Sequence, residues 1–167
     1  MNAEPAPLAG VRVLDVSRFV SGPLCTFVLA SMGAEVISVE SPRLSTSRRL
    51  PPFAHPDGGS TDHYVEDAIS IPFLKRGRGK RSVALDITVP HGANLVRRLA
   101  MRSDVLVENS RSDDMTRFGL GYEQLAAANG RLVYCAISGY GYDAPDRPAM
   151  DNIVQAASGV MAKTGFA

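Results

Sequence analysis

The residues of this chain that could do chemistry gather where apolar runs end. The first group is Ser17–Pro23 (SRFVSGP), which follows a short apolar run and precedes a helical pattern. Backbone N–H groups at the start of a helix bind anions or the polar edge of a ligand. Neither a GxGxxG nor a Walker spacing is present, so a plain turn between strand and helix is the simpler interpretation.

A strongly basic segment, Lys75–Arg81 (KRGRGKR), leads straight into another apolar run. Such charge runs usually lie in solvent. Lys80 and Arg81 adjoin a predicted strand, however, so the fold should hold them in place, and fixed cations suit phosphates. Nucleic acid would fit the run alone, but the formal net charge is only +1 and no aromatic residues interleave with the basic ones. We therefore predict a small anionic ligand and no nucleic-acid partner.

The segment Glu108–Arg111 (ENSR), with Arg117 downstream, follows a third apolar run. Asn109 at a strand end can hydrogen-bond a heterocycle or an amide. Arg117 is well placed for a phosphate. The alternative is that Ser112 or Asp113 caps a helix and the arginines face solvent. The residues alone leave these two interpretations equal.

The last group comprises Ser138–Tyr142 (SGYGY) and Asp151. Glycines let a backbone approach a ligand closely. An aspartate at the start of a helix is ordinarily an N-cap carboxylate, and the residues alone favour that interpretation here. No Ser/His/Asp or Cys/His set is evident, and no metal-ligand spacing relates the three histidines, His55, His63 and His91. The sequence predicts no metal site.

Alternating strands and helices must position these groups. Short apolar runs predict strands over Arg12–Ser17, Ala34–Glu40, Ser82–Ile87, Asp104–Glu108 and Leu132–Ile137. Helices are expected from Ser21–Pro23 to Gly33, from Thr88 as a cap, from Ser112–Asp114 to Gly119, over Tyr122–Ala128 and over Asp151–Met161. This order predicts an α/β domain with a mostly parallel sheet, in which the continuously apolar fifth strand is central. Ligands of such sheets bind at the carboxyl ends of the strands, where the candidate groups lie.

The stretch 41–79 differs from the rest of the chain. It is rich in Pro, Gly, Ser, Arg and Asp and shows little periodicity. We expect a long irregular loop, which in a compact domain is normally functional or disordered.

Composition limits the remaining possibilities. The chain has 167 residues, 45% hydrophobic and 21% charged, an ordinary balance for a globular domain. Cys25 and Cys135 lie within apolar segments and are expected to be buried, reduced thiols. The first ten residues lack the features of a signal peptide, and no stretch approaches the length of a membrane span. We expect a cytoplasmic protein with no membrane partner.

Taken in order, four blocks of the sequence resemble one family closely. They are PLAGVRVLDVSRFVSGPLCTFVLASMGAEVISVESP, RGKRSVALDITVPHGANLVRRLAMRSDVLVENSR, RFGLGYEQLAAANGRLVYCAISGYG and RPAMDNIVQAASGVMAKTG. Together they resemble the N-terminal part of family III CoA-transferases. The resemblance implies a Rossmann-like domain, residues 1–167 forming the CoA-binding portion of a larger fold in which two chains interlock as rings. It also implies transfer of CoA between carboxylic acids, with acyl-CoA as substrate and no metal or redox cofactor.

The resemblance also implies which residues bind CoA. Contacts are expected at Phe19, Val20 and Ser21 after the first strand, at Leu85, Asp86, Ile87 and Thr88, and at Asn109, Ser110 and Arg117. Asp151 matches an acidic position that lines the active site near the thioester. The family's nucleophile is an aspartate downstream of SGVMAKTG, so we expect the C-terminal half of the fold, and with it the nucleophile, to be absent from this chain. A homodimer or a complementing C-terminal chain is the expected partner.

Two departures from the family pattern favour an alternative. Ser41 stands where the family usually has an arginine, and Arg111-Ser112-Asp113 replaces Arg-Pro-Gly. Both changes should weaken CoA binding or shift its phosphates, so a non-catalytic binding or interaction protein is the alternative. A part of a 2-methylacyl-CoA racemase is a weaker interpretation, because the matching stretch Leu125–Ala128 lacks the histidine of that branch.

Overall fold

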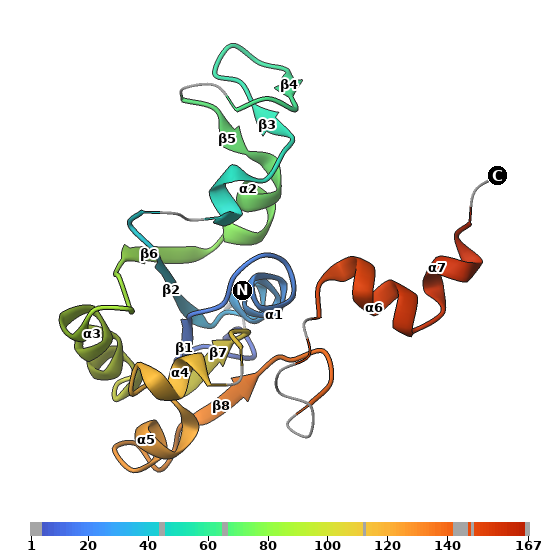
Figure 1. Ribbon diagram of the computed structural model, residues 1–167. Coiled ribbons are helices and arrows are strands. Elements are labelled where there is room, and N and C mark those ends of the chain that lie inside the picture. Colours follow the sequence, from blue (N-terminus) through green and yellow to red (C-terminus); the bar gives the residue numbers. More distant parts are fainter. Residues whose placement is uncertain are drawn as a thin grey trace.

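The computed structural model describes residues 5–165, apart from 44–45, 65–66, 112, 142–146 and 148. Five parallel strands form the main sheet in the order β6-β2-β1-β7-β8 (Figure 1). Their bounds are Arg12–Asp15 (β1), Glu35–Glu40 (β2), Lys80–Ala84 (β6), Val105–Glu108 (β7) and Val133–Ala136 (β8). The predicted α/β domain with a parallel sheet is confirmed. The strand order reverses between β1 and β7, which is the feature that creates a ligand crevice in Rossmann-like sheets.

Helices cover both faces of the sheet. α1 (Ser21–Ser31) connects β1 to β2, and its inner residues pack with the buried Val13 and Val36. α3 (Pro90–Ala100), α4 (Asp114–Arg117) and α5 (Tyr122–Ala126) connect the later strands and cover the other face. The larger core lies there and includes the fully buried Leu14, Val96 and Leu106. Adjacent residues of β1 thus point to opposite faces, as the pleat requires.

Thr88 does not cap α3, contrary to the prediction. The N-cap position is Val89, which offers no side-chain cap, and Pro90 occupies the first helical position. Thr88 instead donates its hydroxyl and its backbone N–H to Asp86 Oδ1, at 2.6 and 3.0 Å. Such local side-chain bonds compete with capping, and proline at the first helical position already spares the helix one unpaired donor.

The segment 46–77, expected to be irregular, carries several short elements. They are η1 (Thr46–Arg49), β3 (Phe53–Ala54), β4 (Ser60–Thr61), β5 (Ile69–Ser70) and α2 (Ile71–Gly77). The strands form a separate antiparallel sheet in the order β4-β3-β5, which stands above the main sheet in Figure 1. Phe53 is only 2% exposed and meets the ring of Tyr64 edge to face. Two-residue strands leave no alternation in the sequence, so periodicity could not reveal them.

Two further predictions fail at the C-terminal end. β8 is an edge strand among the described residues, not a central one, and its Val133 is 61% exposed. The helix predicted over Asp151–Met161 is divided into α6 (Asp151–Ala157) and α7 (Val160–Lys163) by Gly159, whose φ of 76° leaves the helical region. Neither helix has a buried residue, and both project away from the sheet (Figure 1).

Candidate functional site

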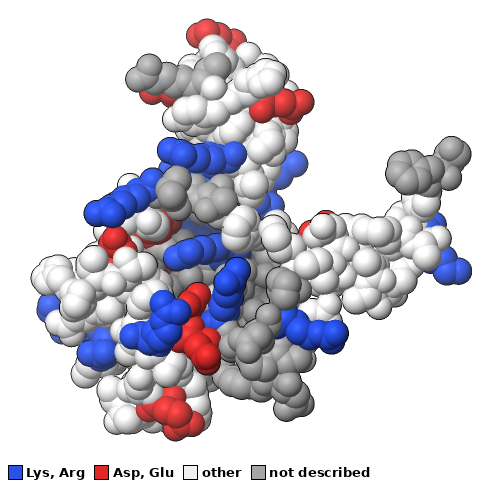
Figure 2. All heavy atoms as spheres, in the orientation of Figure 1, with Lys and Arg blue, Asp and Glu red and all other residues white. Residues whose placement is uncertain are grey.

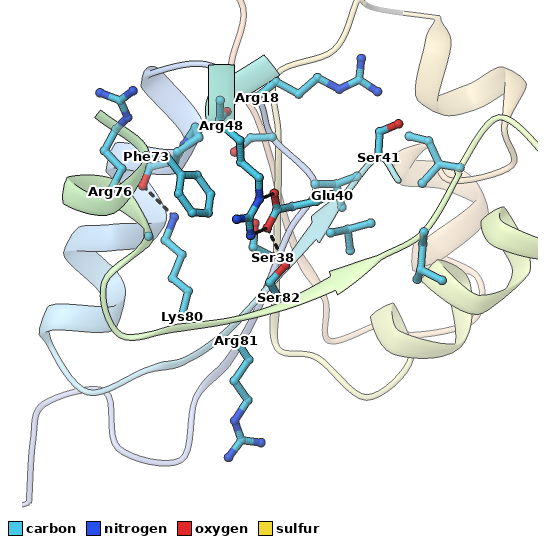
Figure 3. A pocket seen from close by; sticks show the side chains of 18 of the residues that line it. Arg18, Ser38, Glu40, Ser41, Arg48, Phe73, Arg76, Lys80, Arg81 and Ser82 are labelled. Carbon is cyan, nitrogen blue, oxygen red and sulfur yellow. Dashed lines mark hydrogen bonds and ion pairs between the residues drawn. The ribbon is translucent and has the colours of Figure 1, made fainter. Parts of the chain in front are cut away.

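A cavity of about 280 Å³ opens between the main sheet and the 46–77 segment (Figure 3). The residues that follow β1, β2 and β6 line it from the sheet, and η1 and α2 line it from the other side. Four of the residues that the family resemblance assigns to CoA are among its walls, namely Leu85, Asp86, Ile87 and Thr88. Ser17 and Arg18 of the first candidate group and Lys80 and Arg81 of the basic segment line it as well. The parallel sheet therefore brings members of several candidate groups to one cavity.

Arg48 of η1 lies between the cavity and the end of β2. Its Nε and Nη2 donate to the two carboxylate oxygens of Glu40 at 2.7 and 2.9 Å, and its guanidinium lies 4.1 Å from the centroid of the Phe73 ring. Ser82 on β6 also donates to Glu40. The hydrogen bonds with Glu40 raise the pKa of Arg48, while that carboxylate neutralises its charge. Arg48 thus joins the 46–77 segment to the sheet.

Arg76 of α2 also lines the cavity, and its environment is different. Its Nη2 is enclosed by protein atoms and has no hydrogen-bond partner among the described residues. Burial lowers the pKa of this guanidinium. A buried donor without a partner costs stability and is therefore unusual in a folded protein. Because Nη2 itself is enclosed, an anion in the cavity would contact the other parts of this guanidinium.

Lys80 and Arg81 do not offer the free cations expected from the sequence. The Lys80 ammonium is 3.0 Å from Asp15 Oδ2, 2.7 Å from Thr26 Oγ1 and 2.9 Å from the Pro23 carbonyl oxygen. These three contacts use all of its donors. Arg81 points away from the other labelled side chains in Figure 3 and forms an ion pair with Glu35 at 3.1 Å.

The turn between β1 and α1 carries the group Ser17–Ser21. Asn109, at the end of β7, accepts a hydrogen bond from the Arg18 N–H and donates to the Arg18 carbonyl oxygen, both at 2.8 Å. The same amide lies 3.3 Å from Ser21 Oγ. Phe19 adopts a φ of 64°, a left-handed conformation that is uncommon for an aromatic residue. Asn109 thus bridges the point where the strand order reverses.

Two carboxyl groups near the carboxyl ends of the strands, those of Glu108 and Asp86, have distinct electrostatic environments. Glu108 is buried, and this burial raises its pKa, although Oε2 accepts a hydrogen bond from the Ser110 N–H at 2.6 Å. Asp86 on the cavity wall loses its proton more readily than an ordinary aspartic acid, because hydrogen bonds from Thr88 lower its pKa.

Basic side chains gather across the middle of the face shown in Figure 2, between the sheet and the 46–77 segment. A second cavity of about 510 Å³ adjoins the first and shares Glu40, Ser41, Arg48 and Ser82 with it. Arg43 and Arg49 line only this second cavity. The arrangement supplies positive charge at two neighbouring hollows, which suits a ligand with more than one anionic group.

Comparison with known proteins identifies the family. Residues 8–167 match CoA-transferase family III. The chain belongs to this family. Succinate–glutarate CoA-transferase of Agrobacterium fabrum is 40% identical over 98% of this chain and 40% of its own length. Succinyl-CoA:glutarate CoA-transferase of Mus musculus is 39% identical over 95% of this chain and 35% of its own length.

Solved structures agree with this assignment to CoA-transferase family III. A CAIB/BAIF family protein from Brucella suis superposes with a TM-score of 0.82 at 34% identity, covering 95% of this chain and 40% of that one. Rv3272 from M. tuberculosis gives 0.79 at 36% identity, covering 93% and 41%. The chain thus spans about 40% of the length of these relatives and corresponds to part of each of them.

The residues that the family resemblance assigns to CoA lie in three places. Leu85–Thr88 line the cavity, whereas Phe19–Ser21 form the adjoining turn and Asn109 braces it. Phe19 and Val20 are 45% and 51% exposed, so their apolar side chains are open to a ligand. Ser110 follows Asn109 and binds Glu108 through its backbone.

Arg117 and Asp151 lie apart from the cavity lining. Arg117 is at the end of α4, where it forms an ion pair with Asp114 at 3.2 Å with 69% of its side chain exposed. α6 and α7 together form an arm that projects away from the sheet, called the projecting arm below. Asp151 begins α6 and accepts a hydrogen bond from Gln155 Nε2 at 2.5 Å. Their predicted roles in CoA binding and near the thioester remain predictions. Ser112 and Tyr142, named with two of the candidate groups, lie outside the described residues.

Of the arginines that line the cavity, sequence reasoning singled out Arg81 but not Arg18, Arg48 or Arg76. Arg18 belongs to the first candidate group and Arg76 to the basic run, but neither was distinguished from its neighbours. Nothing in the sequence marked Arg48, because the fold of 46–77 alone brings it to Glu40.

No helix of the described residues is long and apolar enough to cross a membrane. Within the same residues no cluster of three or more His, Cys, Asp or Glu side chains could hold a metal ion.

Proposed function

We propose that this chain is the CoA-binding part of an enzyme that transfers CoA between carboxylic acids. The observation that carries the proposal is the cavity beneath the 46–77 segment, with the Arg76 guanidinium in its wall, in a chain of CoA-transferase family III. CoA carries several phosphate charges, and guanidinium groups bind phosphates well. We place its anionic part at this cavity and its remainder along the turn that presents Phe19 and Val20.

We further propose dicarboxylic acids as the substrates. The relatives are named for succinate, glutarate, mesaconate, D-citramalate, L-malate and oxalate, and each of these compounds carries two carboxylates. One carboxylate of such a substrate would form the thioester, and the second would remain charged. The exposed guanidinium groups of Arg43 and Arg49 supply positive charge at the second cavity, close to the proposed CoA site.

The chemistry that the family resemblance implies begins with an enzyme carboxylate. That carboxylate attacks the acyl-CoA thioester and forms a mixed anhydride as the CoA thiolate leaves. The thiolate then attacks the enzyme-derived carbonyl of the anhydride, which forms an enzyme-bound CoA thioester and releases the donor acid as its carboxylate. Each acyl transfer passes through an oxyanion that backbone N–H groups can stabilise. We assign the nucleophile to a residue beyond 1–167. In this proposal Asp151 lines the active site. That site is complete only when the projecting arm, formed by α6 and α7, packs against the rest of the enzyme.

A partner chain completes the proposed enzyme. Several apolar side chains of α1 are half exposed, including Leu24, Val28 and Met32, and so are Val154 and Met161 on the arm. Extended apolar surfaces of this kind mark interfaces. One relative is named as the beta subunit of succinyl-CoA–L-malate CoA-transferase. We propose that a second copy of the chain, or a complementing C-terminal chain, covers these apolar side chains.

Calorimetric titration with CoA tests the proposal. The chain, alone or with a complementing C-terminal half, should release heat on binding, and absence of binding in both cases would refute the function. Arg117→Ala tests the phosphate contact implied by the resemblance, since loss of a charge-assisted bond costs about 1.5–3 kcal/mol. Unchanged CoA affinity in that variant would remove Arg117 from the site.

The second candidate function is a CoA-binding protein without catalysis. The ion pair between Asp114 and Arg117 favours it, because it engages one cation that the family resemblance assigns to phosphate. Ser41, which lines both cavities where the family usually has arginine, favours it too. A complemented enzyme that binds CoA tightly but shows no turnover with any dicarboxylate would establish this alternative.

A further inference from the structure

A buried ion pair lies directly below the turn between β1 and α1. Lys80 and Asp15 are 3.0 Å apart, and their side chains are only 5% and 1% exposed. Thr26 of α1 donates its hydroxyl to Asp15 Oδ2 at 2.6 Å, and the Pro23 carbonyl oxygen accepts from Lys80. The pair therefore joins the edge strand β6 to the end of β1 and to the first turns of α1.

The second oxygen of Asp15 holds the beginning of the turn. Oδ1 accepts hydrogen bonds from the backbone N–H of Ser17, at 3.1 Å, and from the Ser17 hydroxyl. Ser17 in turn packs against Gly22, where an added Cβ would lie 2.1 Å from Ser17 Cβ. The two ends of the turn are thus in contact, and the Asp15 carboxylate fixes one of them.

Asn109 holds the middle of the turn from the opposite side. Its amide pairs with both backbone groups of Arg18, at 2.8 Å each, much as a neighbouring strand would. Phe19 follows immediately in its left-handed conformation. Non-glycine residues remain in such conformations only where the surroundings over-determine them, and such places are often ligand sites.

We propose that Asp15, Lys80 and Asn109 are positioning residues for the CoA site. They act through the Arg18–Ser21 turn, which they hold in the shape that presents Phe19 and Val20 at the crevice. Lys80 and Asn109, which the sequence suggested as direct ligand contacts, have their donors engaged with protein oxygens. That the ligand is CoA rests on the proposed function, whereas the claim that these three residues hold the turn does not.

Amide hydrogen exchange of the 167-residue chain, measured by NMR without ligand, reads the turn directly. Asn109→Ala should speed exchange of the Arg18 N–H by about tenfold, as expected for the loss of two ordinary hydrogen bonds. Asn129→Ala is the matched control, because the Asn129 amide also donates to two backbone oxygens, of Ala100 and Ser103, far from the turn. It should destabilise the chain similarly and leave Arg18 unchanged.

The charged pair needs its own variant. Lys80→Met leaves Asp15 buried without its partner and can prevent folding. The double variant Asp15→Asn with Lys80→Met buries no unpaired charge. It is measured in place of Lys80→Met if that single variant does not fold. It should speed exchange of the Ser17 N–H while amides in the middle of α3 keep their protection.

Titration with CoA separates the two levels of the proposal. Asn109→Ala and the double variant should each bind CoA about tenfold more weakly, with Asn129→Ala at the wild-type affinity. Weaker binding by Asn109→Ala with unchanged Arg18 exchange would make Asn109 a direct contact and overturn its positioning role. Should the wild-type chain not bind CoA, the proposed function fails, and the exchange rates alone decide whether these residues hold the turn. Wild-type exchange at Ser17 and Arg18 in all folded variants would refute the inference.

Discussion

Replacing Arg76 should change stability and ligand affinity in opposite directions. Its Nη2 is enclosed and has no hydrogen-bond partner in the part of the chain that the structure describes, and burial lowers the pKa of the group. A buried unsatisfied donor costs about 1–3 kcal/mol. Because a single nitrogen of Arg76 is concerned, the lower end of this range applies, and Arg76→Met should raise the free energy of unfolding by about 1 kcal/mol. In a chain of this size that corresponds to a rise of about 2–4 °C in Tm.

The same substitution should weaken CoA binding. If a phosphate of CoA satisfies Arg76, the variant loses a charge-assisted hydrogen bond worth about 1.5–3 kcal/mol, which lowers the affinity by about 10- to 150-fold. Arg78→Met is the matched control, since Arg78 is exposed two residues away and lies over the Phe27 ring outside the cavity lining. It should bind CoA like the wild type.

Thermal unfolding with and without CoA gives both quantities in one assay, because a ligand that binds the folded state raises Tm. Arg76→Lys adds a further distinction, since lysine keeps the charge but not the planar fork that suits phosphate. We expect it to bind CoA between the wild type and Arg76→Met. A Met variant that is less stable than the wild type and binds CoA with unchanged affinity would show that Arg76 is structural.

Three further predictions concern the turn, the buried glutamate and catalysis. Gly22→Ala should lose about 1–3 kcal/mol of stability in urea unfolding because its Cβ would meet Ser17, whereas Gly130→Ala, with no neighbouring atom closer than 3.9 Å, should not. Burial raises the pKa of Glu108, so the folded state keeps this proton to higher pH than the unfolded chain, and the stability it contributes is lost as pH rises through the folded pKa. Glu108→Gln should therefore be more stable than the wild type at neutral pH but equal to it below the ordinary glutamate pKa; a constant difference at every pH would contradict this. Residues 1–167 alone should show no CoA-transferase turnover, and Asp151→Asn in a complemented enzyme should slow turnover while hydroxylamine still traps the covalent intermediate on another residue.

Apolar runs and turn residues predicted much of the main sheet. Four strands of the main sheet match predicted runs to within two residues at each end, whereas β6 begins two residues and ends three residues before its predicted run. α1 begins at Ser21 and ends before Gly33 as expected. These features depend on local burial and backbone preference, which a sequence expresses directly. The apolar run of β8 predicted a buried central strand, yet β8 is an edge strand among the described residues and none of its residues is buried. An apolar run does not specify which strands lie beside it, and the prediction failed for that reason.

The sequence by itself determined the family, the parallel sheet and the edge where polar groups collect, because each follows from residue order and short-range pattern. Tertiary structure alone decided what those groups do. Lys80 is in a basic run, yet folding places its ammonium against Asp15, 65 residues earlier in the chain. Asn109 meets Arg18 across 91 residues, and Arg48 reaches Glu40 only because the short elements of 46–77 fold back over the sheet. Whether a charged or polar group is free for a ligand depends on its partners in space, and one-dimensional spacing carries no information about partners so distant in the chain.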